Sequence, residues 1–390
     1  AVLIARQYLE LSPLGKERFL TLLAEDFDLD YKQVKTTIDK WQPNPVSTNQ
    51  LRQALESPRL TLLRQFNELP DGIKFLVNMR ADLLSIKDKS QALQGLQQEM
   101  KQLLHAWFDL GFLQLEKITW DSPTSLLEKL IEYEAVHAIN GWSDLKNRLA
   151  NDRCCYAFFH PQMPDEPLIF IEVALTKGLA GEMDPLLDEE APLLDTDTAD
   201  TAIFYSISNT QRGLAGIGFG NFLIKNVVAQ LLQQFPHLSQ FSTLSPIPGF
   251  NKWLTANPDL ALAQLSEQQH QQLKTYSTEL GVAANMSAVL ASEWHDNKDL
   301  SAWLEAPTKQ LISHYLTTEK RGTKALDPVA HFHLSNGAKA ARLNWRANLS
   351  KRGLKESAAV MINYVYELEQ IESNCVAYVE NGQIASGLAG

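Results

Sequence analysis

A glycine-rich turn between a strand and a helix constrains the fold of this chain more than any other feature. Four glycines fall within eight residues, from Gly213 to Gly220. The preceding segment, Ala202–Ser208, is rich in β-branched and aromatic residues, which favour strands. The following segment, from about Asn221 to Phe235, has apolar residues at helical spacing and ends at Pro236. This order of strand, turn and helix predicts a sheet covered by helices.

Further strands are predicted around this unit. Arg153–Phe159 and Leu168–Leu175 are short apolar runs, and the proline-rich segment His160–Pro167 between them is typical of a hairpin loop. A strand at Gln240–Leu244 follows the helix. Gly181–Asp200 carries eight acidic residues and no Lys or Arg, which predicts a solvated, mobile loop.

The first hundred residues predict helices instead. Ser90–Phe108 has one apolar stripe at steps of three and four residues, and shorter stripes recur at Arg18–Ala24 and Pro58–Phe66. A chain of 390 residues is too long for one typical core. We therefore predict an α+β fold with an all-α helical bundle over residues 1–118, used for packing or assembly, and a second domain over residues 119–390.

Composition excludes several classes of protein. A net charge of −11 argues against a general nucleic-acid binder, which would present a basic face. Apolar runs are too short to cross a bilayer, so no membrane association is expected. The three cysteines, Cys154, Cys155 and Cys375, suit a reducing compartment better than a disulfide framework. With no signal-like N-terminus and no peroxisomal C-terminus, we expect a cytoplasmic protein.

The glycine-rich turn is also a candidate anion site. Glycines allow several backbone N–H groups to converge beside the positive end of a helix dipole, a geometry that suits phosphate. No Gly-Lys-Ser/Thr follows, as a nucleotide P-loop requires, and the glycine order differs from the dinucleotide fingerprint. The candidate binding residues are Arg212, Gly213, Gly216, Ile217, Gly218, Gly220 and Asn221.

Ser245 is the candidate for chemistry in the segment Phe241–Phe250, where two prolines stiffen the chain directly after a strand. An α/β-hydrolase would need a Gly-x-Ser-x-Gly elbow, and Leu244-Ser-Pro differs from it. Pro246 also lacks the N–H that commonly helps to form an oxyanion hole. The interpretation is therefore either a plain strand end or a hydroxyl held out for hydrogen bonding.

His331 and His333 form a second candidate, in Asp327–Ala338. If the segment is extended, residues two apart face the same side and could suggest a metal. No third ligand stands at zinc-like spacing, so no metal site is predicted. A structural histidine is one interpretation. A neutral imidazole at His333, oriented as a proton carrier between Phe332 and Leu334, is the other.

Together these segments resemble a known family. The turn is similar to the pyrophosphate site of the GNAT acetyltransferase fold, although it departs from the usual order by a residue. The wider match is to malonyl-CoA decarboxylase and runs over essentially the whole chain. It is carried by Glu134–His137, Val173–Thr176, Phe235–Leu238, Phe241–Phe250, Lys252–Leu254, Asp327–Ala338, Arg342–Trp345 and Asn363–Tyr366.

The resemblance implies a GNAT-like α/β domain with a mixed sheet, decarboxylation of malonyl-CoA to acetyl-CoA and CO2, and homo-oligomers, either dimers or tetramers, through the helical domain. It implies that Ser245 holds the malonyl carboxylate, that His333 supplies a proton and that Tyr366 orients His333 or contacts the acyl group. Some members carry a glutamate where this chain has Gly218, so a relay through that carboxylate is in doubt here.

No cofactor is expected, because the thioester itself accepts the electrons released by decarboxylation. Acyl transfer to an amine and non-catalytic binding of acyl-CoA are the alternatives. Formation of acetyl-CoA and CO2 without an amine acceptor would separate them from decarboxylation.

Overall fold

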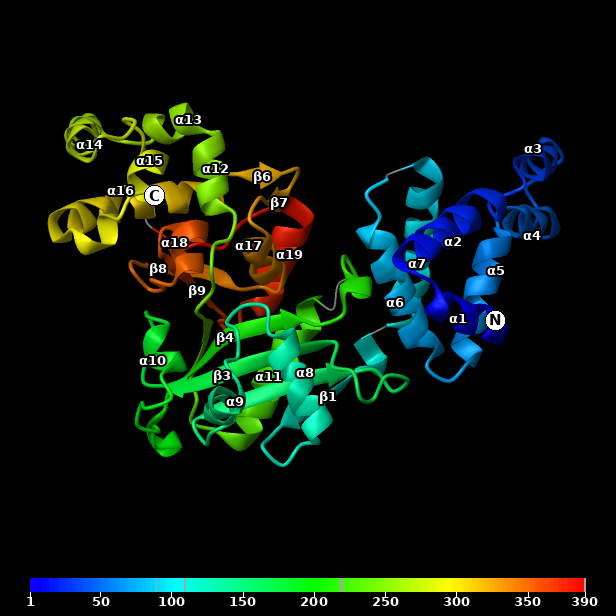
Figure 1. The fold of residues 1–390 in the computed structure, drawn as a ribbon, viewed down its shortest axis with the longest axis horizontal. Helices are drawn as coiled ribbons and strands as arrows, with labels where there is room; N and C mark the ends of the chain where they lie inside the picture. Colours follow the sequence, from blue (N-terminus) through cyan, green and yellow to red (C-terminus); the bar gives the residue numbers. More distant parts are fainter. Residues whose placement is uncertain (89, 109, 218–219, 389–390) are drawn as a thin grey trace. The chain divides into compact units, whose positions relative to one another are not determined.

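The computed structural model describes residues 1–88, 90–108, 110–217 and 220–388. Helices occupy the first hundred residues, as predicted (Figure 1). Their bounds are α1 Val2–Glu10, α2 Pro13–Asp26, α3 Tyr31–Asp39, α4 Pro45–Ala54, α5 Pro58–Gln65, α6 Gly72–Ser85 and α7 Gln91–Trp107.

Local capping explains where several of these helices begin. Ser12 and Ser57 each accept a hydrogen bond from a backbone N–H in the first turn, and a proline follows each of them directly. Proline fits the first helical position, where its missing N–H would have no partner. Helix α7 then buries Leu93, Leu96, Met100, Leu103 and Leu104, the stripe seen in the sequence.

Buried charge also holds this region together, which the sequence did not indicate. The Arg59 guanidinium is almost fully buried and pairs with Asp28 at 2.8 Å and with Glu99 at 2.9 Å. Because Arg59 lies on α5 and Glu99 on α7, the pair ties two helices that are distant in sequence.

A mixed sheet follows, in the order β1-β2-β3-β4-β5-β9-β8. Strand β5 runs parallel to β4 and antiparallel to β9, and β9 runs antiparallel to β8. The bounds are β1 Gln114–Ile118, β2 Arg153–Phe159, β3 Ile169–Thr176, β4 Thr201–Asn209, β5 Gln240–Thr243, β8 Lys339–Asn344 and β9 Met361–Val365, and a separate hairpin pairs β6 Lys320–Arg321 with β7 Lys324–Ala325. The predicted fold class, helices first and then a mixed sheet, is confirmed.

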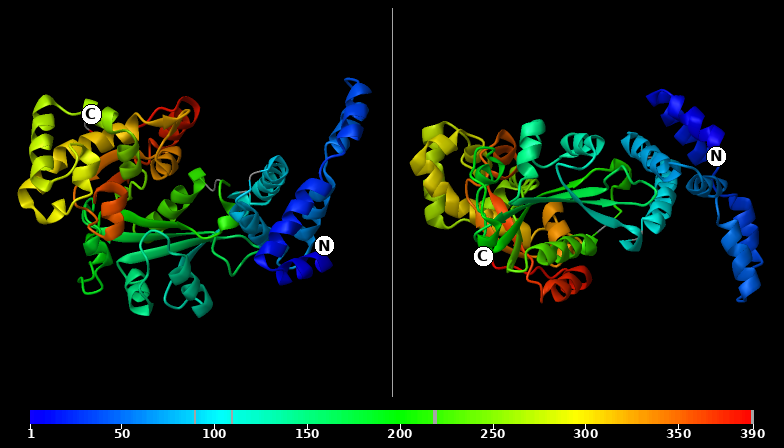
Figure 2. Two further views of the ribbon diagram at one scale, coloured as in Figure 1. Left: turned by 45° about the horizontal axis from the view of Figure 1, so that its top comes forward. Right: turned by 90° about the horizontal axis from the view of Figure 1, so that it is seen from below.

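Helices cover both faces of the sheet. Helices α8 and α9 lie against one face and α11 against the other, as the views in Figures 1 and 2 agree. The remaining bounds are α8 Thr124–Tyr133, α9 Trp142–Arg148, α10 Asp184–Leu187, α11 Gly220–Gln234, α12 Phe250–Ala256, α13 Pro258–Ala263, α14 Glu267–Leu280, α15 Met286–Leu290, α16 Lys298–Thr317, α17 Pro328–Ser335, α18 Lys351–Ser357 and α19 Ile371–Asn381.

The chain divides into two compact units. A helical unit comprises Ala1–Glu116 together with Ala157–Phe170 and Asn209–Phe219. A sheet unit comprises Lys117–Tyr156, Ile171–Ser208 and Gly220–Gly390. Most of the glycine-rich turn therefore belongs with the N-terminal helices.

The acidic segment Gly181–Asp200 is only partly the solvated loop that was predicted. Met183 and Leu186 are buried, and they pack in one apolar cluster with Ile203, Tyr205 and Met361. The N–H of Met183 also donates to the Ala347 carbonyl at 2.8 Å. Apolar residues among the carboxylates thus anchor the first half of the segment to the sheet unit.

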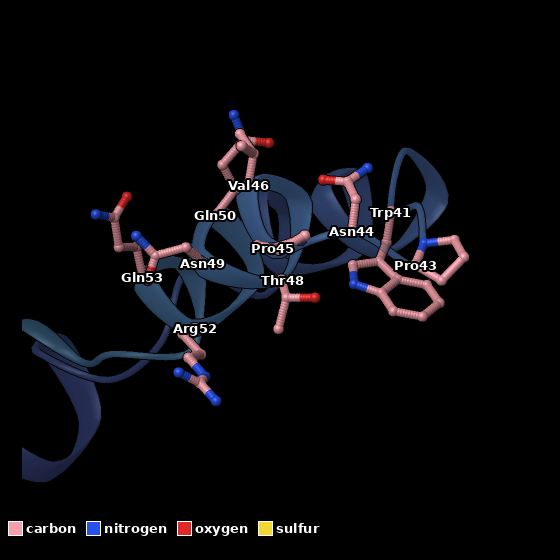
Figure 3. A pocket seen from close by; sticks show the side chains of 10 residues that line it. All are labelled: Trp41, Pro43, Asn44, Pro45, Val46, Thr48, Asn49, Gln50, Arg52 and Gln53. Carbon is pink, nitrogen blue, oxygen red and sulfur yellow. The ribbon is translucent and has the colours of Figure 1, made fainter.

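An open groove lies on the α3–α4 hairpin of the helical unit (Figure 3). Its lining contains none of the residues predicted to act in catalysis or in binding; it consists of Trp41, Pro43, Asn44, Pro45, Val46, Thr48, Asn49, Gln50, Arg52 and Gln53. Among the residues that the structure describes, no helix has the length and apolar character needed to cross a bilayer.

Candidate active site

Ser245 is fixed by the sheet as well as by its prolines. Its N–H donates to the Ile362 carbonyl at 2.8 Å, and the Ile362 N–H donates back to the Ser245 carbonyl at 2.9 Å. This pair extends the contact between β5 and β9 to Ser245, two residues beyond the last residue of β5. Ser245 is only 5% exposed. The serine is therefore held just beyond the end of the internal strand β5, with its hydroxyl turned into the protein.

His333 lies on a helix and not on an extended segment, so that part of the prediction is wrong. Asp327 accepts hydrogen bonds from the N–H groups of Val329 and Ala330, and Pro328 takes the first helical position of α17. Residues two apart on a helix point in different directions. Accordingly the ring of His331 bonds the Tyr378 hydroxyl, whereas His333 turns towards Ser245.

The structure brings together the three residues predicted to act in catalysis. Ser245 Oγ lies 3.1 Å from His333 Nε2, and His333 Nδ1 lies 2.8 Å from the Tyr366 hydroxyl. All three side chains are buried. Tyr366 directly follows β9, and its N–H donates to the Phe241 carbonyl on β5 at 2.8 Å. The same two strands therefore position the serine and the tyrosine on either side of the imidazole.

Burial sets the charge of this group of side chains. Desolvation lowers the pKa of His333 to about 3, so the imidazole is neutral near pH 7. Desolvation also raises the pKa of Tyr366 well above its ordinary value, so the phenol keeps its proton. The Ser245 hydroxyl donates to Thr243 Oγ1 at 2.8 Å, so Ser245 Oγ accepts from Nε2–H, and Nδ1 then accepts the proton of Tyr366.

Thr243 completes the chain of hydrogen bonds and was missed in the sequence. Its Oγ1 accepts the Ser245 hydroxyl at 2.8 Å and the Tyr364 N–H at 3.1 Å. The chain of donors thus runs in one direction, from Tyr366 through His333 and Ser245 to Thr243. The three hydroxyl residues of this stretch were visible in the sequence, but nothing there showed which hydroxyl would accept from Ser245.

Tyr364 also supports the imidazole. Its ring stacks on His333 with the centroids 4.7 Å apart and the planes inclined by 24°. Within the part of the chain that the structure describes, its buried hydroxyl has no hydrogen-bond partner. Stacking of this kind restricts rotation of the imidazole about its bond to Cβ.

Three polar residues from the segments that carry the family resemblance form a hydrogen-bond network that reaches the Thr243 carbonyl. The Asn363 amide donates to the Thr243 carbonyl at 2.7 Å, and its oxygen accepts from Asn344 at 2.8 Å and from Arg342 at 3.0 Å. Asn363 is fully buried. Neighbouring strands β8 and β9 thus fix the backbone of the residue that receives the hydrogen bond of Ser245.

Asp327 joins the loop of Ser245 to the helix of His333. Its Oδ1 caps α17, and its Oδ2 accepts the Gly249 N–H at 3.1 Å and the Tyr315 hydroxyl at 3.4 Å. A side chain at Gly249 would collide with Tyr315, because an added Cβ would lie 2.1 Å from that hydroxyl oxygen. Asp327 therefore controls the spacing of the two reactive side chains from outside their hydrogen-bond chain.

The glycine-rich turn is less uniform than predicted. In the helical unit, Gly213 and Ile217 are buried, whereas Arg212 and Gly216 are exposed. Gly216 has φ 75°, which favours glycine. Gly218 lies outside the described residues. Gly220 and Asn221 begin α11, as the predicted helix requires.

Among the described residues, no three His, Cys, Asp or Glu side chains lie together in a way that could hold a metal ion. The proposal that the reaction needs no cofactor remains a prediction. In the part of the chain that the structure describes, Cys154, Cys155 and Cys375 form no disulfide.

Two family models cover nearly the whole chain. The malonyl-CoA decarboxylase N-terminal domain matches residues 27–108, and the C-terminal domain of the same family matches residues 111–389. Mitochondrial malonyl-CoA decarboxylase of Rattus norvegicus is 40% identical over 356 residues, which is 86% of this chain and 71% of the rat protein. The counterpart of Anser anser anser is 39% identical over 338 residues, 82% of this chain and 66% of that protein.

Solved structures agree with these matches. The crystal structure of malonyl-CoA decarboxylase from Rhodopseudomonas palustris is similar with a TM-score of 0.89 and 41% identity, and the match covers 98% of this chain and 91% of that one. The enzyme from Agrobacterium vitis gives a TM-score of 0.88 and 36% identity over 98% and 92% of the two chains. Fold and site therefore define a member of a carboxy-lyase class. The chain belongs to the malonyl-CoA decarboxylase family.

Proposed function

We propose that this chain converts malonyl-CoA to acetyl-CoA and CO2. The observation that carries the proposal is the buried, one-directional chain of hydrogen bonds from Tyr366 through His333 to Ser245, in a member of this family. Once a substrate displaces their present partners, Nε2–H and Oγ–H supply two donors at one place, and the site has no nucleophilic elbow. Such an arrangement serves an anionic group better than it serves covalent attack.

Decarboxylation of a malonyl thioester proceeds through an enolate. The bond between the malonyl carboxylate carbon and the α-carbon breaks, and its electron pair moves into the thioester carbonyl to form an enolate. CO2 leaves, and the α-carbon of the enolate takes one proton to give acetyl-CoA. Overall one proton is consumed, so the site needs a proton carrier and donors for negative charge, and no oxidant or reductant.

Ser245, His333 and Tyr366 each have one part in binding the carboxylate or in transferring the proton. When the substrate binds, the Ser245 hydroxyl turns from Thr243 to donate to the malonyl carboxylate and holds it out of the thioester plane. A bound carboxylate beside His333 favours the charged imidazolium, because a nearby anion raises the pKa that burial had lowered. The imidazolium takes its second proton from solvent, delivers the Nε2 proton to the α-carbon and returns to the neutral ring. Its Nδ1–H then donates to the Tyr366 oxygen, which keeps the ring oriented. Low exposure of the site limits access of water to the enolate.

The remaining predictions concern binding, assembly and compartment. We propose that the turn around Arg212–Asn221 binds the CoA diphosphate, as in the fold that it resembles. We also propose a dimer or tetramer formed through the helical region, since many large apolar side chains are exposed there, among them Leu3, Leu9, Phe27, Ile38 and Trp41. A cytoplasmic location stays a prediction, and the named rat and goose relatives are mitochondrial.

Incubation of the purified protein with malonyl-CoA, with EDTA present and no amine acceptor, tests the proposal. Stoichiometric acetyl-CoA and CO2 are expected, measured by liquid chromatography and by trapping of labelled CO2. Acyl transfer predicts no turnover until an amine is added, and a binding module predicts CoA affinity without turnover. Either outcome would contradict decarboxylation.

A further inference from the structure

Within the helical unit, helix α6 packs against the glycine-rich turn. Gly213 lies so close to α6 that an added Cβ would stand 1.8 Å from the Val77 carbonyl oxygen. The Arg80 guanidinium, also on α6, donates from Nη2 to the Ala215 carbonyl at 2.9 Å and from Nη1 to the Gly213 carbonyl. The first half of the turn is therefore shaped by an N-terminal helix.

Arg80 is a buried cation for which the described residues supply no counter-ion. Its side chain is fully buried, and among the described residues no carboxylate pairs with it; its two hydrogen bonds are to backbone carbonyls. Desolvation lowers its pKa, which indicates that burial of this charge is costly. A charge of this kind is normally compensated nearby, and among the described residues the compensation comes from the Gly213 and Ala215 carbonyl dipoles.

Lys101 is a second cation close to the turn. It lies on α7, and its Nζ would be 3.5 Å from a Cβ placed on Gly216. Within the described ranges no carboxylate lies at ion-pair distance from it. Gly216 is exposed and has positive φ, so an incoming ligand can approach the backbone there and meet the lysine ammonium.

We propose that Lys101 binds the diphosphate of the CoA substrate directly, and that Arg80 positions the turn that receives it. This inference rests on the proposed function, because it assigns residues of the helical unit to the CoA site. It gives that unit a part in substrate binding in addition to packing and assembly. A lysine ammonium suits a diphosphate as a mobile point charge, whereas the Arg80 fork suits two fixed carbonyls.

The test compares Lys101→Gln with Lys35→Gln, a matched loss of one charge at an exposed lysine on α3 of the same unit. Three substrates are used: malonyl-CoA, malonyl-3′-dephospho-CoA and malonyl-N-acetylcysteamine, which lacks the diphosphate. For Lys101→Gln the ratio of kcat/KM for malonyl-CoA to kcat/KM for the short thioester is expected to fall about tenfold, as the loss of one charge-assisted hydrogen bond predicts. The change is expected in KM. Lys35→Gln is expected to leave the ratio unchanged.

Two kinds of result would overturn the inference about Lys101. An unchanged ratio, or an equal fall for Lys35→Gln, removes Lys101 from the site. A fall with malonyl-CoA that disappears with the dephospho substrate assigns Lys101 to the 3′-phosphate instead. If the wild-type protein releases no CO2 the proposed function fails, yet calorimetric titration with free CoA still compares wild type and Lys101→Gln.

Arg80 is tested with Arg80→Lys, which keeps the charge but loses the fork, and with Arg80→Met. Both are expected to lower the same ratio through KM and to lower the thermal midpoint. If Arg80→Met does not fold, Arg80→Lys decides. A lowered midpoint in Arg80→Lys with an unchanged substrate ratio would leave Arg80 a purely structural residue and would refute its positioning role.

Discussion

Thr243 sets the direction of the hydrogen bonds in the active site, and replacing it with valine tests this directly. Valine has nearly the same shape but no hydroxyl. In wild type, Thr243 Oγ1 accepts from Ser245 at 2.8 Å and from the Tyr364 N–H at 3.1 Å. Without it, the acceptor that remains for Ser245 in this chain is His333 Nε2, 3.1 Å away. The chain of donors then reverses, and the imidazole proton moves to Nδ1.

Two magnitudes follow for Thr243→Val. The Tyr364 N–H is left buried without a partner, which costs about 1–3 kcal/mol of stability. Reversal of the chain turns Nε2 into an acceptor when the substrate arrives, so kcat is expected to fall by about a hundredfold, at the lower end of the contribution of a positioned acid. KM is expected to change little, because the contacts to CoA are untouched.

The assay combines steady-state kinetics with nitrogen-15 NMR of the His333 ring, which distinguishes the two neutral tautomers. Thr243→Ser is the control, since it keeps the acceptor and loses only a methyl group, worth about 1 kcal/mol. It should keep the wild-type tautomer and most of kcat. A Thr243→Val protein with a proton still on Nε2 and normal kcat would refute this account.

Three further predictions follow from the same site. Ser245→Ala and His333→Asn should each lower turnover at least a hundredfold, with an unchanged circular dichroism spectrum and unchanged CoA binding by calorimetry; turnover close to wild type would contradict their roles. Asp327→Asn keeps the cap of α17 but loses an acceptor for Gly249, so the urea midpoint and kcat should fall while KM stays constant. Because burial lowers the pKa of His333 to about 3 and that of His137 to about 4, protonation favours the unfolded chain as pH falls below about 6.5. Between pH 6.5 and pH 5 each histidine should lower the free energy of unfolding by about 2 kcal/mol. In urea titrations, His333→Asn should lose the part of this decrease that His333 causes. An equal pH dependence in wild type and variant would show that His333 is not buried in its neutral form.

Local patterns predicted the central strands and the helix after the glycine turn nearly to the residue. Strand β2 has the predicted bounds, and α11 begins and ends one residue earlier than expected. The predictions for these segments are correct because apolar periodicity and a flanking proline or glycine are local signals. Strands β8 and β9 were not predicted as strands, because pairing between separate segments holds them: β8 pairs with β9, and β9 also pairs with β5, which lies far earlier in the sequence.

The helix of His333 shows a conflict between two local signals. Alternating His and apolar residues suggested an extended segment, whereas Asp327 followed by Pro328 is a start signal for a helix. The helix signal prevailed, because the aspartate satisfies two free N–H groups of the first turn. The pairing of Ser245 with His333 across 88 residues came only from the family resemblance, since no local pattern encodes a contact of that separation.

The glycine-rich turn shows how far one residue type can mislead. All its glycines looked alike in the sequence, and one purpose, exposure of backbone N–H groups, was predicted for them. In the structure Gly213 is required because a helix backbone occupies the place of its side chain, whereas Gly216 is required by its positive φ and lies open. Substitution of Gly213 should therefore displace the turn from α6. Substitution of Gly216 should instead weaken binding of the CoA diphosphate. Because the two requirements arise from different neighbours, only a structure that places α6 and α7 beside the turn could separate them.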